Sequence, residues 1–450
     1  MRDSEAQRKR IYPKQPSGFY TSMRTLLSAV LLLFLLAIPF VKLGGHPFML
    51  LNVIERKFII FGTAFGPHDF YLFVLGMITL IVFIILFTVI LGRLFCGWIC
   101  PQTVFMEMVF RRIDYWIEGN HQQQRQLNES PWHAAKIRKK FTKYVMYSVL
   151  SFLIGNILLA WIIGVDNLIR IATAPPSEHL SGLTAMLAFS AMFYWVFISF
   201  REQACILVCP YGRLQGVLLD QNSIVIAYDF IRGEPRGKIT RGEESTKGDC
   251  IDCHLCVEVC PTGIDIRKGT QLECINCTAC IDACDEVMEK IHNPKGLIRY
   301  DSAEGIANQS RFRWTAKPVS YAILLFLLAT ALTVLLATRK EVDVTILRTP
   351  GMFYQEQPNG RVSNVYDIKI LNKAFSPVTI GVQLHSIPGE VRIVGEALIV
   401  GAQQVFEGKL LVILDRTSLH NVSTPVEFDL TIGNTPLETL ETTFLGPGRQ

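Results

Sequence analysis

The stretch CIDCHLCVEVCPTGIDIRKGTQLECINCTACIDACD, from Cys250 to Asp285, decides how the middle of this chain folds. It holds two C-x2-C-x2-C-x3-C runs, of which the first is followed by Pro261 and the second by Asp285. This spacing is the bacterial pattern for two [4Fe-4S] clusters, in which three cysteines of one run bind a cluster and the fourth binds the other cluster. The predicted ligands are Cys250, Cys253, Cys256 and Cys284 for cluster 1, and Cys274, Cys277, Cys280 and Cys260 for cluster 2.

Eight cysteines at this density could also form zinc sites or disulfide bonds. Zinc ribbons, however, use two C-x2-C pairs separated by a longer loop, and disulfide scaffolds belong to oxidising compartments. Two iron-sulfur clusters use all eight thiolates, and electron transfer is their common role. We therefore expect a ferredoxin-like domain at about residues 245–295.

The rest of the chain has the composition of an integral membrane protein. Of its 450 residues 50% are hydrophobic and only 18% are charged, and the apolar residues form long blocks. Five stretches are long enough to cross a lipid bilayer. They run approximately from Thr25 to Val41, Phe70 to Leu91, Tyr144 to Val165, Leu183 to Phe200 and Pro318 to Thr338. The net charge of +5 is modest, and we expect no nucleic-acid partner.

Lysine and arginine gather before the first span and between the second and third. They are Arg2, Arg8, Lys9, Arg10, Lys14 and Arg24, followed by Arg93, Arg111, Arg112, Arg125, Lys136, Arg138, Lys139 and Lys140. Such residues favour the cytoplasmic side of a membrane. We therefore expect the N-terminal tail (residues 1–24) and the segment 218–317 in the cytoplasm, and everything after the fifth span (318–338) outside. The loop from Arg125 to Lys143 is interpreted as a solvated, lipid-facing charge cluster.

Residues 339–450 have a different character, with no cysteine and with short β-rich runs between turn signals. The runs are Tyr366 to Leu371, Val378 to Leu384, Val391 to Ile399 and Val426 to Ile432. Strands at this spacing predict an all-β sandwich. Alternation of apolar residues from Val378 to Leu384 predicts one buried face. We expect a docking or structural module in the periplasm.

Two further cysteine pairs follow the second and fourth spans. Cys96 and Cys100 lie in FCGWICP, and Cys205 and Cys209 lie in ACILVCP, so that both pairs read C-x3-C-P. If the helices continue this far, the i,i+4 spacing puts each pair of sulfurs on one helix face, and the proline ends the regular hydrogen bonding. Each pair closes a two-span hairpin within residues 25–217. The sequence therefore predicts an internal repeat whose cysteine ends meet at one membrane surface.

These four cysteines allow several roles. Cysteine is an ordinary small apolar residue in membrane helices, so a single pair could serve packing alone. Two copies beside a ferredoxin module favour a shared site, which is a metal site, a third iron-sulfur site, or thiol pairs that face a copper ion. Soft thiolates prefer Cu(I), zinc and iron-sulfur clusters, which narrows the metal without choosing it. No histidine lies in the middle of a span, which argues against a b-type haem.

The order of these features resembles the cbb3-type cytochrome c oxidase accessory family known as CcoG, FixG or RdxA. The features are the N-terminal spans, both C-x3-C-P motifs with Tyr211-Gly212-Arg213 after the second, two ferredoxin motifs, one more span and an Ig-like tail. The resemblance covers nearly the whole chain, and its visible departure is Asp285 in place of proline. It implies a multi-domain membrane protein of the bacterial inner membrane, with five spans, an inserted 2[4Fe-4S] domain and a C-terminal Ig-like sandwich.

The same resemblance implies reduction of Cu(II) to Cu(I) during assembly of the oxidase, with Cys96, Cys100, Cys205 and Cys209 as the copper or redox site. The implied partners are the lipid bilayer, a copper ion, copper chaperones or oxidase assembly factors, and a cytoplasmic electron donor. Two other functions stay open. One is a quinol- or ferredoxin-linked electron relay to a periplasmic reductase, and the other is a non-catalytic assembly scaffold.

Overall fold

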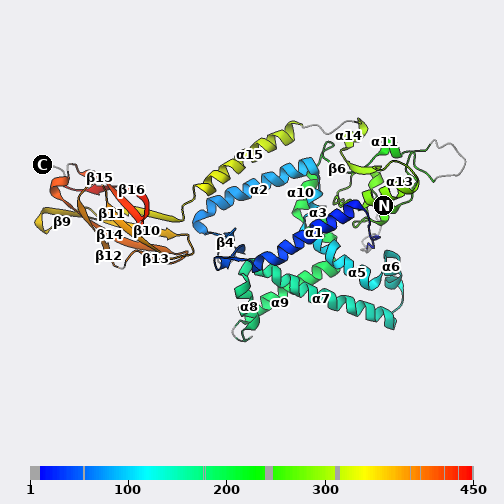
Figure 1. Cartoon of the computed structure of the whole chain (residues 1–450), viewed down its shortest axis with the longest axis horizontal. Coiled ribbons are helices and arrows are strands. Elements are labelled where there is room, and N and C mark those ends of the chain that lie inside the picture. The colour runs from blue at the N-terminus through cyan, green and yellow to red at the C-terminus, as the bar shows by residue number, and fades with distance from the viewer. Residues whose placement is uncertain are drawn as a thin grey trace, which may run out of the picture. The chain divides into compact units, whose positions relative to one another are not determined.

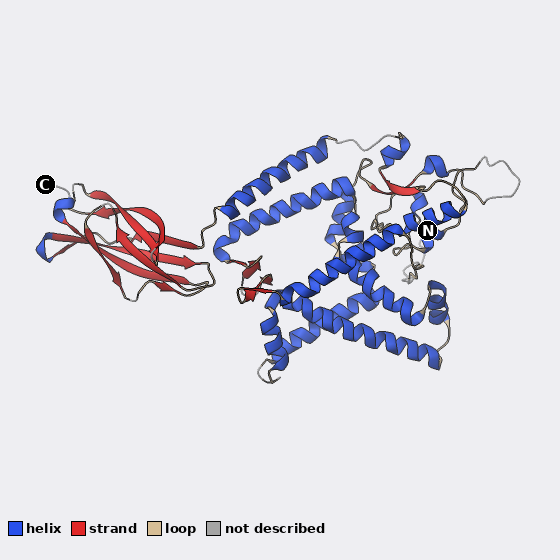
Figure 2. Ribbon diagram, viewed as in Figure 1, coloured by secondary structure: helices blue, strands red, loops and turns tan. Residues whose placement is uncertain are grey.

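The computed structural model of the chain describes residues 11–53, 56–175, 177, 179–238, 247–309, 315–385, 387–395, 397–419, 421–433 and 435–447. The chain packs as two units (Figure 1). The first unit contains the residues up to Asn52 together with Phe73–Leu332, and the second contains Val53–Leu72 and the residues from Thr333 onward. Helices dominate the first unit and strands dominate the second (Figure 2).

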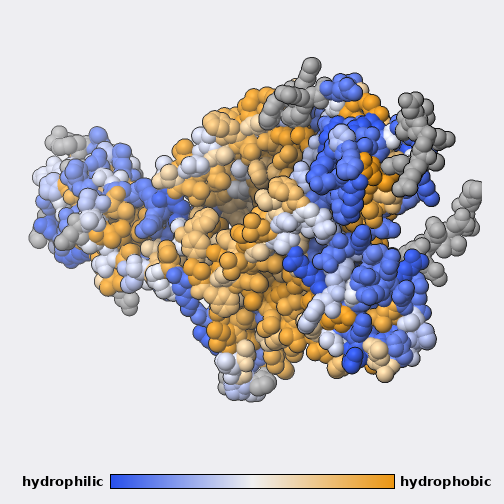
Figure 3. Space-filling view, turned by 45° about the vertical axis from the view of Figure 1, so that its right-hand side comes forward, coloured by the Kyte–Doolittle hydropathy of each residue, from blue (hydrophilic) through white to orange (hydrophobic). Residues whose placement is uncertain are grey.

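Five helices in the described part of the chain are long and apolar enough to cross a membrane. They are α1 (Phe19–Ala37) with the 3-10 turn η1 (Ile38–Phe40), α2 (Phe70–Leu91) after η2 (Pro67–Asp69), α7 (Ala134–Ile163), α9 (Leu180–Trp195) with the π turn η4 (Val196–Phe200), and α15 (Ala316–Ala337). Their large apolar side chains are mostly exposed, as Leu33 and Phe326 illustrate, and Figure 3 shows this hydrophobic surface in orange. Such a surface is stable only against lipid. The prediction of a multi-pass membrane protein is confirmed.

The third span differs from its prediction, because α7 begins at Ala134 and not near Tyr144. Lys136, Lys140 and Lys143, which were expected in a solvated loop, lie on this helix and are buried. Lys140 contacts Glu118 at 2.7 Å, and Lys143 contacts Asp114 at 2.6 Å. The interpretation as a solvated charge cluster is therefore wrong for these three lysines. Carboxylates of a neighbouring helix neutralise Lys140 and Lys143, whereas Lys136 donates to the backbone carbonyls of Asn128 and Ser130 at 3.0 and 2.5 Å. Local hydropathy contains no sign of these contacts.

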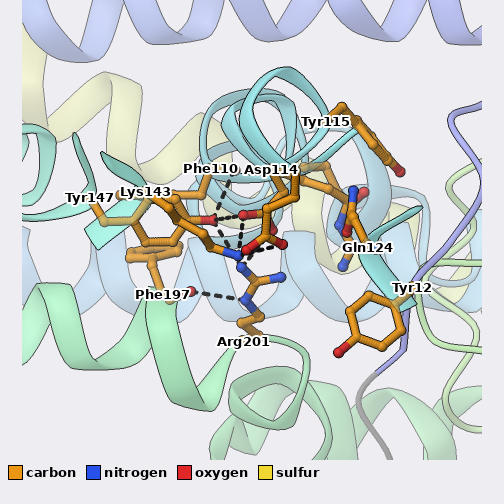
Figure 4. Close-up of polar contacts among 12 residues, drawn as sticks. Tyr12, Phe110, Asp114, Tyr115, Gln124, Lys143, Tyr147, Phe197 and Arg201 are labelled. Carbon is orange, nitrogen blue, oxygen red and sulfur yellow. Dashed lines mark hydrogen bonds and ion pairs between the residues drawn. The ribbon is translucent and has the colours of Figure 1, made fainter. Parts of the chain in front are cut away.

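The carboxylates come from α5 (Arg111–Glu118), and Asp114 is the centre of the network (Figure 4). Asp114 accepts hydrogen bonds from the Tyr147 hydroxyl at 2.8 Å and from Arg201 at 2.7 Å, in addition to its contact with Lys143. Burial favours the neutral acid, but Arg201 and Lys143 lower the pKa of Asp114 to about 2. Removing one partner of such a buried pair costs about 3–5 kcal/mol. The network therefore fixes α5, α7 and Arg201 relative to one another.

The ferredoxin module lies between two antiparallel strands, β6 (Val225–Tyr228) and β7 (Ile298–Asp301). Its other elements are α11 (Phe230–Gly233), α12 (Leu255–Glu258), η6 (Ile266–Lys268) and α13 (Ala279–Lys290), with α14 (Ala303–Ala307) after β7. Ile226, Ile281, Met288 and Leu297 belong to its core, which also includes Cys250 and Cys256.

The module also holds the start of the first membrane helix. The Asp282 carboxylate of α13 accepts hydrogen bonds from the backbone N–H groups of Tyr20 and Thr21 at 3.0 and 2.7 Å, and from the Thr21 hydroxyl at 2.6 Å. N–H groups in the first turn of a helix have no partner within the helix. Asp282 therefore caps α1 from a position 261 residues after Thr21 in the sequence.

The second unit is a sandwich of two antiparallel sheets. One sheet has the order β12 (Gly389–Val394), β14 (Val405–Asp415), β10 (Arg361–Asn372) and β8 (Val342–Arg348), with β9 (Gln355–Gln357) also paired to β10; the other has the order β13 (Ile399–Val400), β11 (Val378–Leu384), β15 (Ser423–Ile432) and β16 (Thr435–Leu445). Tyr366, Val412, Phe428 and Phe444 are fully buried in the core. The alternating residues of β11 contribute to this core as predicted, and the all-β sandwich is confirmed.

The predicted strand from Val391 to Ile399 is wrong as a single element. The chain turns at Gly395, where φ is +107°, so that β12 pairs with β14 in one sheet and β13 pairs with β11 in the other. Apolar residues continue through the change of sheet, and periodicity alone therefore does not reveal it.

The second unit also contains a hairpin that the sequence did not suggest, formed by β4 (Lys57–Ile60) and β5 (Thr63–Phe65). Asp69 follows it in η2, and this buried carboxylate pairs with Arg339 at 2.9 Å and Lys373 at 3.0 Å. Further short elements of the described residues are β1 (Lys42–Leu43), β2 (His46–Pro47), β3 (Leu50–Asn52), α6 (His121–Glu129), α8 (Val165–Thr173), η7 (Pro358–Gly360) and η8 (Arg416–Ser418).

Candidate functional site

The eight ferredoxin cysteines line two cavities. We number the cavities after the predicted clusters. Cavity 2 is lined by Cys260, Cys274, Cys277 and Cys280, together with Cys256 and apolar residues such as Ile226 and Ile275. Cys250, Cys253, Cys256 and Cys284 line the other, cavity 1, together with residues such as Tyr228 and Met288. Each cavity thus brings three cysteines of one run together with the fourth cysteine of the other run.

The loops around both cavities fit an iron-sulfur cluster. At equivalent positions, φ is +54° and +60° at Asp252 and His254, and +53° and +67° at Asn276 and Thr278. Left-handed residues of this kind turn successive backbone N–H groups towards one point, and such concavities bind anionic groups including iron-sulfur centres.

The buried thiols of the two cavities also suit the binding of an iron-sulfur cluster. Burial raises the pKa of Cys256 and of Cys274 to about 12, and it also raises the pKa of Cys280 well above its usual value. Thiols in such surroundings lose their protons when they bind a metal, because the metal supplies the opposing positive charge.

The first C-x3-C-P motif is separated from the second membrane helix. The helix α2 ends at Leu91, Gly92 has φ +56°, and a short helix α3 (Leu94–Trp98) follows. The N–H of Cys100 donates to the carbonyl of Phe95, five residues back, at 2.9 Å, and Pro101 begins α4 (Pro101–Val104). The π-helical η3 (Phe105–Phe110) continues from there. The condition for placing Cys96 and Cys100 on one helix face, a helix that continues from the second span, is therefore not met, because the chain turns at Gly92.

The second motif repeats this local structure. Arg201, at φ +37°, follows η4, and the π turn η5 (Ala204–Val208) then carries Cys205. The N–H of Cys209 donates to the carbonyl of Ala204, again five residues back, at 2.9 Å, and Pro210 begins α10 (Pro210–Leu218). The two motifs therefore share a break, a π-type turn and a proline-initiated helix, which supports the internal repeat seen in the sequence.

The thiols of both motifs lie close enough for their charges to interact. Burial, together with the neighbouring thiols of Cys100, Cys205 and Cys209, raises the pKa of Cys96 to about 12. The Cys96 thiol donates to the buried Gln215 side chain at 3.2 Å. Among the described residues, no three His, Cys, Asp or Glu side chains close around a point as a single-ion site requires, and this holds for the ferredoxin cavities too.

One arginine connects both motifs with the ferredoxin module. The Arg93 guanidinium donates to the carbonyl of Gly212, just after the second motif, and to the carbonyl of Leu272, two residues before Cys274. The rings of Phe95 and Tyr211 pack edge to face, with centroids 5.9 Å apart. Arg93 is therefore the point where three distant segments of the chain meet.

The first motif lies against the loop that lines cavity 2, through Cys96 and Gly97 directly and through Trp98 by way of Tyr300. Cys96 packs against the apolar cluster that contains Ile275 and Cys277. A Cβ atom on Gly97 would lie 2.4 Å from the carbonyl oxygen of Ile275, so only glycine fits there. Trp98 donates to the Tyr300 hydroxyl at 3.2 Å, which in turn donates to the Asn276 carbonyl at 3.3 Å. The first motif and cavity 2 are thus direct neighbours.

Two residues of this junction were missed as functional candidates. Arg24 donates to the Gly97 carbonyl at 2.7 Å, and both Arg24 and Arg93 are buried. In the sequence both arginines count only as charges that set the orientation in the membrane. Their sequence position gave one weak signal, because each lies close to the end of a predicted span. An arginine at such a position more commonly faces lipid headgroups.

The fold and the site define a membrane-bound iron-sulfur electron-transfer protein. A family model for a 4Fe-4S dicluster domain matches residues 200–303, a model for a 4Fe-4S binding domain matches residues 73–121, and a model for the IG-like fold at the C-terminal of FixG matches residues 332–447. The match over 73–121 contains Cys96 and Cys100 and none of the eight ferredoxin cysteines.

The chain belongs to the FixG/Rdx family. It is 34% identical to Protein RdxB of Cereibacter sphaeroides over 82% of this chain and 80% of that protein. It is 30% identical to the nitrogen fixation protein FixG of Rhizobium meliloti over 87% of this chain and 82% of that protein. The crystal structure of a FixG-related protein from Vibrio parahaemolyticus is 18% identical and covers 24% of this chain and 97% of that chain, with a TM-score of 0.21.

The contact at Gly97 yields a stability prediction. In Gly97→Ala the added methyl group meets backbone oxygens of Ile275 and Asn276, which move only if the whole loop shifts. Overpacking of this kind costs about 1–3 kcal/mol, and we expect a lower midpoint of thermal unfolding in detergent, followed by the absorbance of the clusters. Gly76→Ala in α2 is the matched control, since a Cβ there meets nothing within 4 Å. Equal midpoints for both variants would contradict the tight contact.

Proposed function

We propose that this protein reduces Cu(II) to Cu(I) during assembly of a cbb3-type cytochrome c oxidase, with Cys96, Cys100, Cys205 and Cys209 as the site that receives the copper ion. The observation that carries the proposal is the contact of the first motif with the loop Ile275–Cys277. It makes Cys96 an immediate neighbour of the electron-transfer module, and the other three thiols lie within electrostatic reach of Cys96.

The proposed cluster ligands are those that share a cavity. Cys250, Cys253, Cys256 and Cys284 hold one [4Fe-4S] cluster, and Cys274, Cys277, Cys280 and Cys260 hold the other; the lining of the two cavities supports this exchange of fourth ligands. When bound, such clusters supply single electrons at low potential. The left-handed residues Asp252, His254, Asn276 and Thr278 aim the backbone N–H groups that stabilise the negative charge.

The thiols act as ligands and not as reductants in this proposal. One electron from the module converts Cu(II) to Cu(I), and no atom is transferred. Because burial keeps the Cys96 and Cys205 thiols protonated, with pKa values of about 12, a bound copper ion displaces protons from them. Thiolates prefer Cu(I), so they favour the product.

Orientation and partners follow from the same proposal. The N-terminus and the ferredoxin module lie in the cytoplasm of a bacterium, the membrane is the inner one, and the sandwich lies in the periplasm. Five of the basic residues counted for orientation are buried, namely Arg24, Arg93, Arg111, Lys136 and Lys140. The orientation is still favoured by the exposed Arg112, Arg125 and Arg138. A cytoplasmic donor delivers electrons, and copper chaperones or oxidase assembly factors receive Cu(I).

A second candidate function is an electron relay to a periplasmic reductase, fed by quinol or by a ferredoxin. The match of the 4Fe-4S binding domain to residues 73–121 favours it, because the cysteines within that match are Cys96 and Cys100. In this alternative the four thiols hold a third iron-sulfur cluster. The iron content separates the two functions, since it is about eight atoms per chain in the first and about twelve in the second.

The double variant Cys96→Ser, Cys100→Ser tests the proposed function. We expect it to retain about eight iron atoms per chain and to lose cupric reduction, because the copper ligands are gone and the ferredoxin ligands are untouched. The measurement is the anaerobic formation of Cu(I), detected with a Cu(I)-specific chelator, after the purified protein has been reduced. Val217→Ser, at an exposed position near the second motif, is the control. Normal copper reduction by the double variant would refute the proposal.

The exchange of fourth ligands has its own test. Because Cys260 lines cavity 2 with Cys277, we expect Cys260→Ser and Cys277→Ser to alter the EPR signal of the same cluster, whereas Cys284→Ser alters the other. The measurement is the EPR spectrum of the anaerobically reduced variants. If Cys260→Ser changed the same signal as Cys250→Ser, each run would bind its own cluster and the exchange would be wrong.

The proposed orientation predicts the behaviour of reporter fusions. A phosphatase that is active only outside the cytoplasm should be active when fused after Gln450 and inactive when inserted near Gly242. The exposed arginines around α5 and α7 are the physical reason. A green fluorescent reporter, which folds in the cytoplasm, serves as the reciprocal control at both positions, and the opposite pattern would reverse the orientation.

A further inference from the structure

The junction between the first motif and cavity 2 contains two buried arginines, Arg24 and Arg93. Arg24 and Arg93 are 4% and 8% exposed, and among the described residues neither forms an ion pair. The buried Nη2 of Arg24 and Nε of Arg93 also lack a hydrogen-bond partner there. Arg111 and Arg201 are similarly buried, yet each of them contacts a carboxylate.

Both guanidinium groups lie beside cysteines of cavity 2. Arg24 donates to the carbonyl of Gly97 at 2.7 Å, and Gly97 packs against the backbone of Ile275, two residues before Cys277. Arg93 donates to the carbonyl of Leu272, two residues before Cys274. The carboxylate of Glu107 also lies within electrostatic reach of Cys277, but it is itself paired with Arg111 at 3.2 Å.

The charges around cavity 1 are arranged differently. Arg267 lines this cavity, but it is paired with Asp252 and Asp265, so its charge is already compensated. Asp285 adds a further negative charge near Cys284. All twelve cysteines lie in the described part of the chain, and Cys253 of cavity 1 is the exposed one among them. Cavity 1 is therefore the more negative and the more solvated of the two.

An unpaired buried charge costs several kcal/mol unless an opposite charge compensates it. The described surroundings of Arg24 and Arg93 offer backbone carbonyls and cysteine sulfurs. A cluster bound by four thiolates carries net negative charge and gains one more on reduction. It is the compensating anion that these two arginines require.

We propose that Arg24 and Arg93 raise the reduction potential of the cluster held in cavity 2, so that an electron entering at the exposed Cys253 side moves inward to the membrane motif. This inference rests on the proposed cluster ligands. Burial alone would lower the potential at cavity 2, because the reduced state carries more negative charge, and the two arginines offset that effect. In this step a single electron would pass from the cluster at cavity 1, which is oxidised, to the cluster at cavity 2, which is reduced. No proton has to follow, since fixed positive charge is already present.

The test is an anaerobic dithionite titration of the full-length protein in detergent, in which EPR follows the two clusters separately. We expect Arg24→Gln and Arg93→Gln each to shift the midpoint of one cluster to a more negative potential and to leave the other unchanged. A shift of about 59 mV corresponds to a tenfold change in the one-electron equilibrium. The shifted cluster should be the one whose spectrum Cys277→Ser alters.

Two further variants separate charge from structure. Arg24→Lys keeps the charge but changes the hydrogen bond to Gly97, so its midpoint should stay near that of the unmodified protein. Arg112→Gln removes an exposed charge close to the same helix, where Arg112 contacts Thr25, and solvent screening should leave both midpoints unchanged. If Arg24→Gln did not fold, Arg93→Gln alone would still decide. Unchanged midpoints in the glutamine variants, or equal shifts in Arg24→Lys and Arg24→Gln, would overturn the proposal.

Discussion

The guanidinium group of Arg93 imposes the constraint on which the functional site depends. It donates to Gly212 and to Leu272, and it lies three residues before Cys96. Two membrane hairpins and a ferredoxin loop, widely separated in the sequence, therefore have to meet around one planar group with fixed donor directions. Gly97 then brings the first motif against the carbonyl of Ile275. The proximity of thiols and clusters, on which the proposed chemistry relies, follows from these two contacts.

The first unit handles buried charge in two contrasting ways. In the network around Asp114, acids and bases are matched, and the result is a rigid support for Arg201 and the second motif. At Arg24 and Arg93 the positive charges lack carboxylate partners among the described residues. Matched pairs fix geometry, whereas an unmatched charge acts on whatever anion is placed beside it. Arginine therefore has two roles near the cysteine motifs. Arg201 is paired and supports the structure, whereas Arg24 and Arg93 act on their surroundings through their charge.

Sequence patterns succeeded where the determining interactions are local. Cysteine spacing indicated which four cysteines share each cavity, because three ligands of a cluster come from one short loop. Alternation in β11 identified a buried strand face for a similar reason. The failures all involve contacts between distant segments. The start of α7 was misplaced because Lys140 and Lys143 are neutralised by another helix, and the break at Gly92 was invisible to hydropathy. Arg24 and Arg93 looked like ordinary membrane-flanking residues until the fold placed them beside the cysteines.

The cap that Asp282 provides for α1 has a consequence for biogenesis. The first helix leaves the ribosome long before residue 282 is synthesised, and its leading N–H groups then depend on water or lipid headgroups. Asp282 lies between Cys280 and Cys284, so it reaches its final position only when the ferredoxin segment folds. Cofactor insertion and completion of the membrane domain are therefore coupled steps. In a chain whose ferredoxin segment is still unfolded, the first turn of α1 lacks the hydrogen bonds that Asp282 accepts from Tyr20 and Thr21.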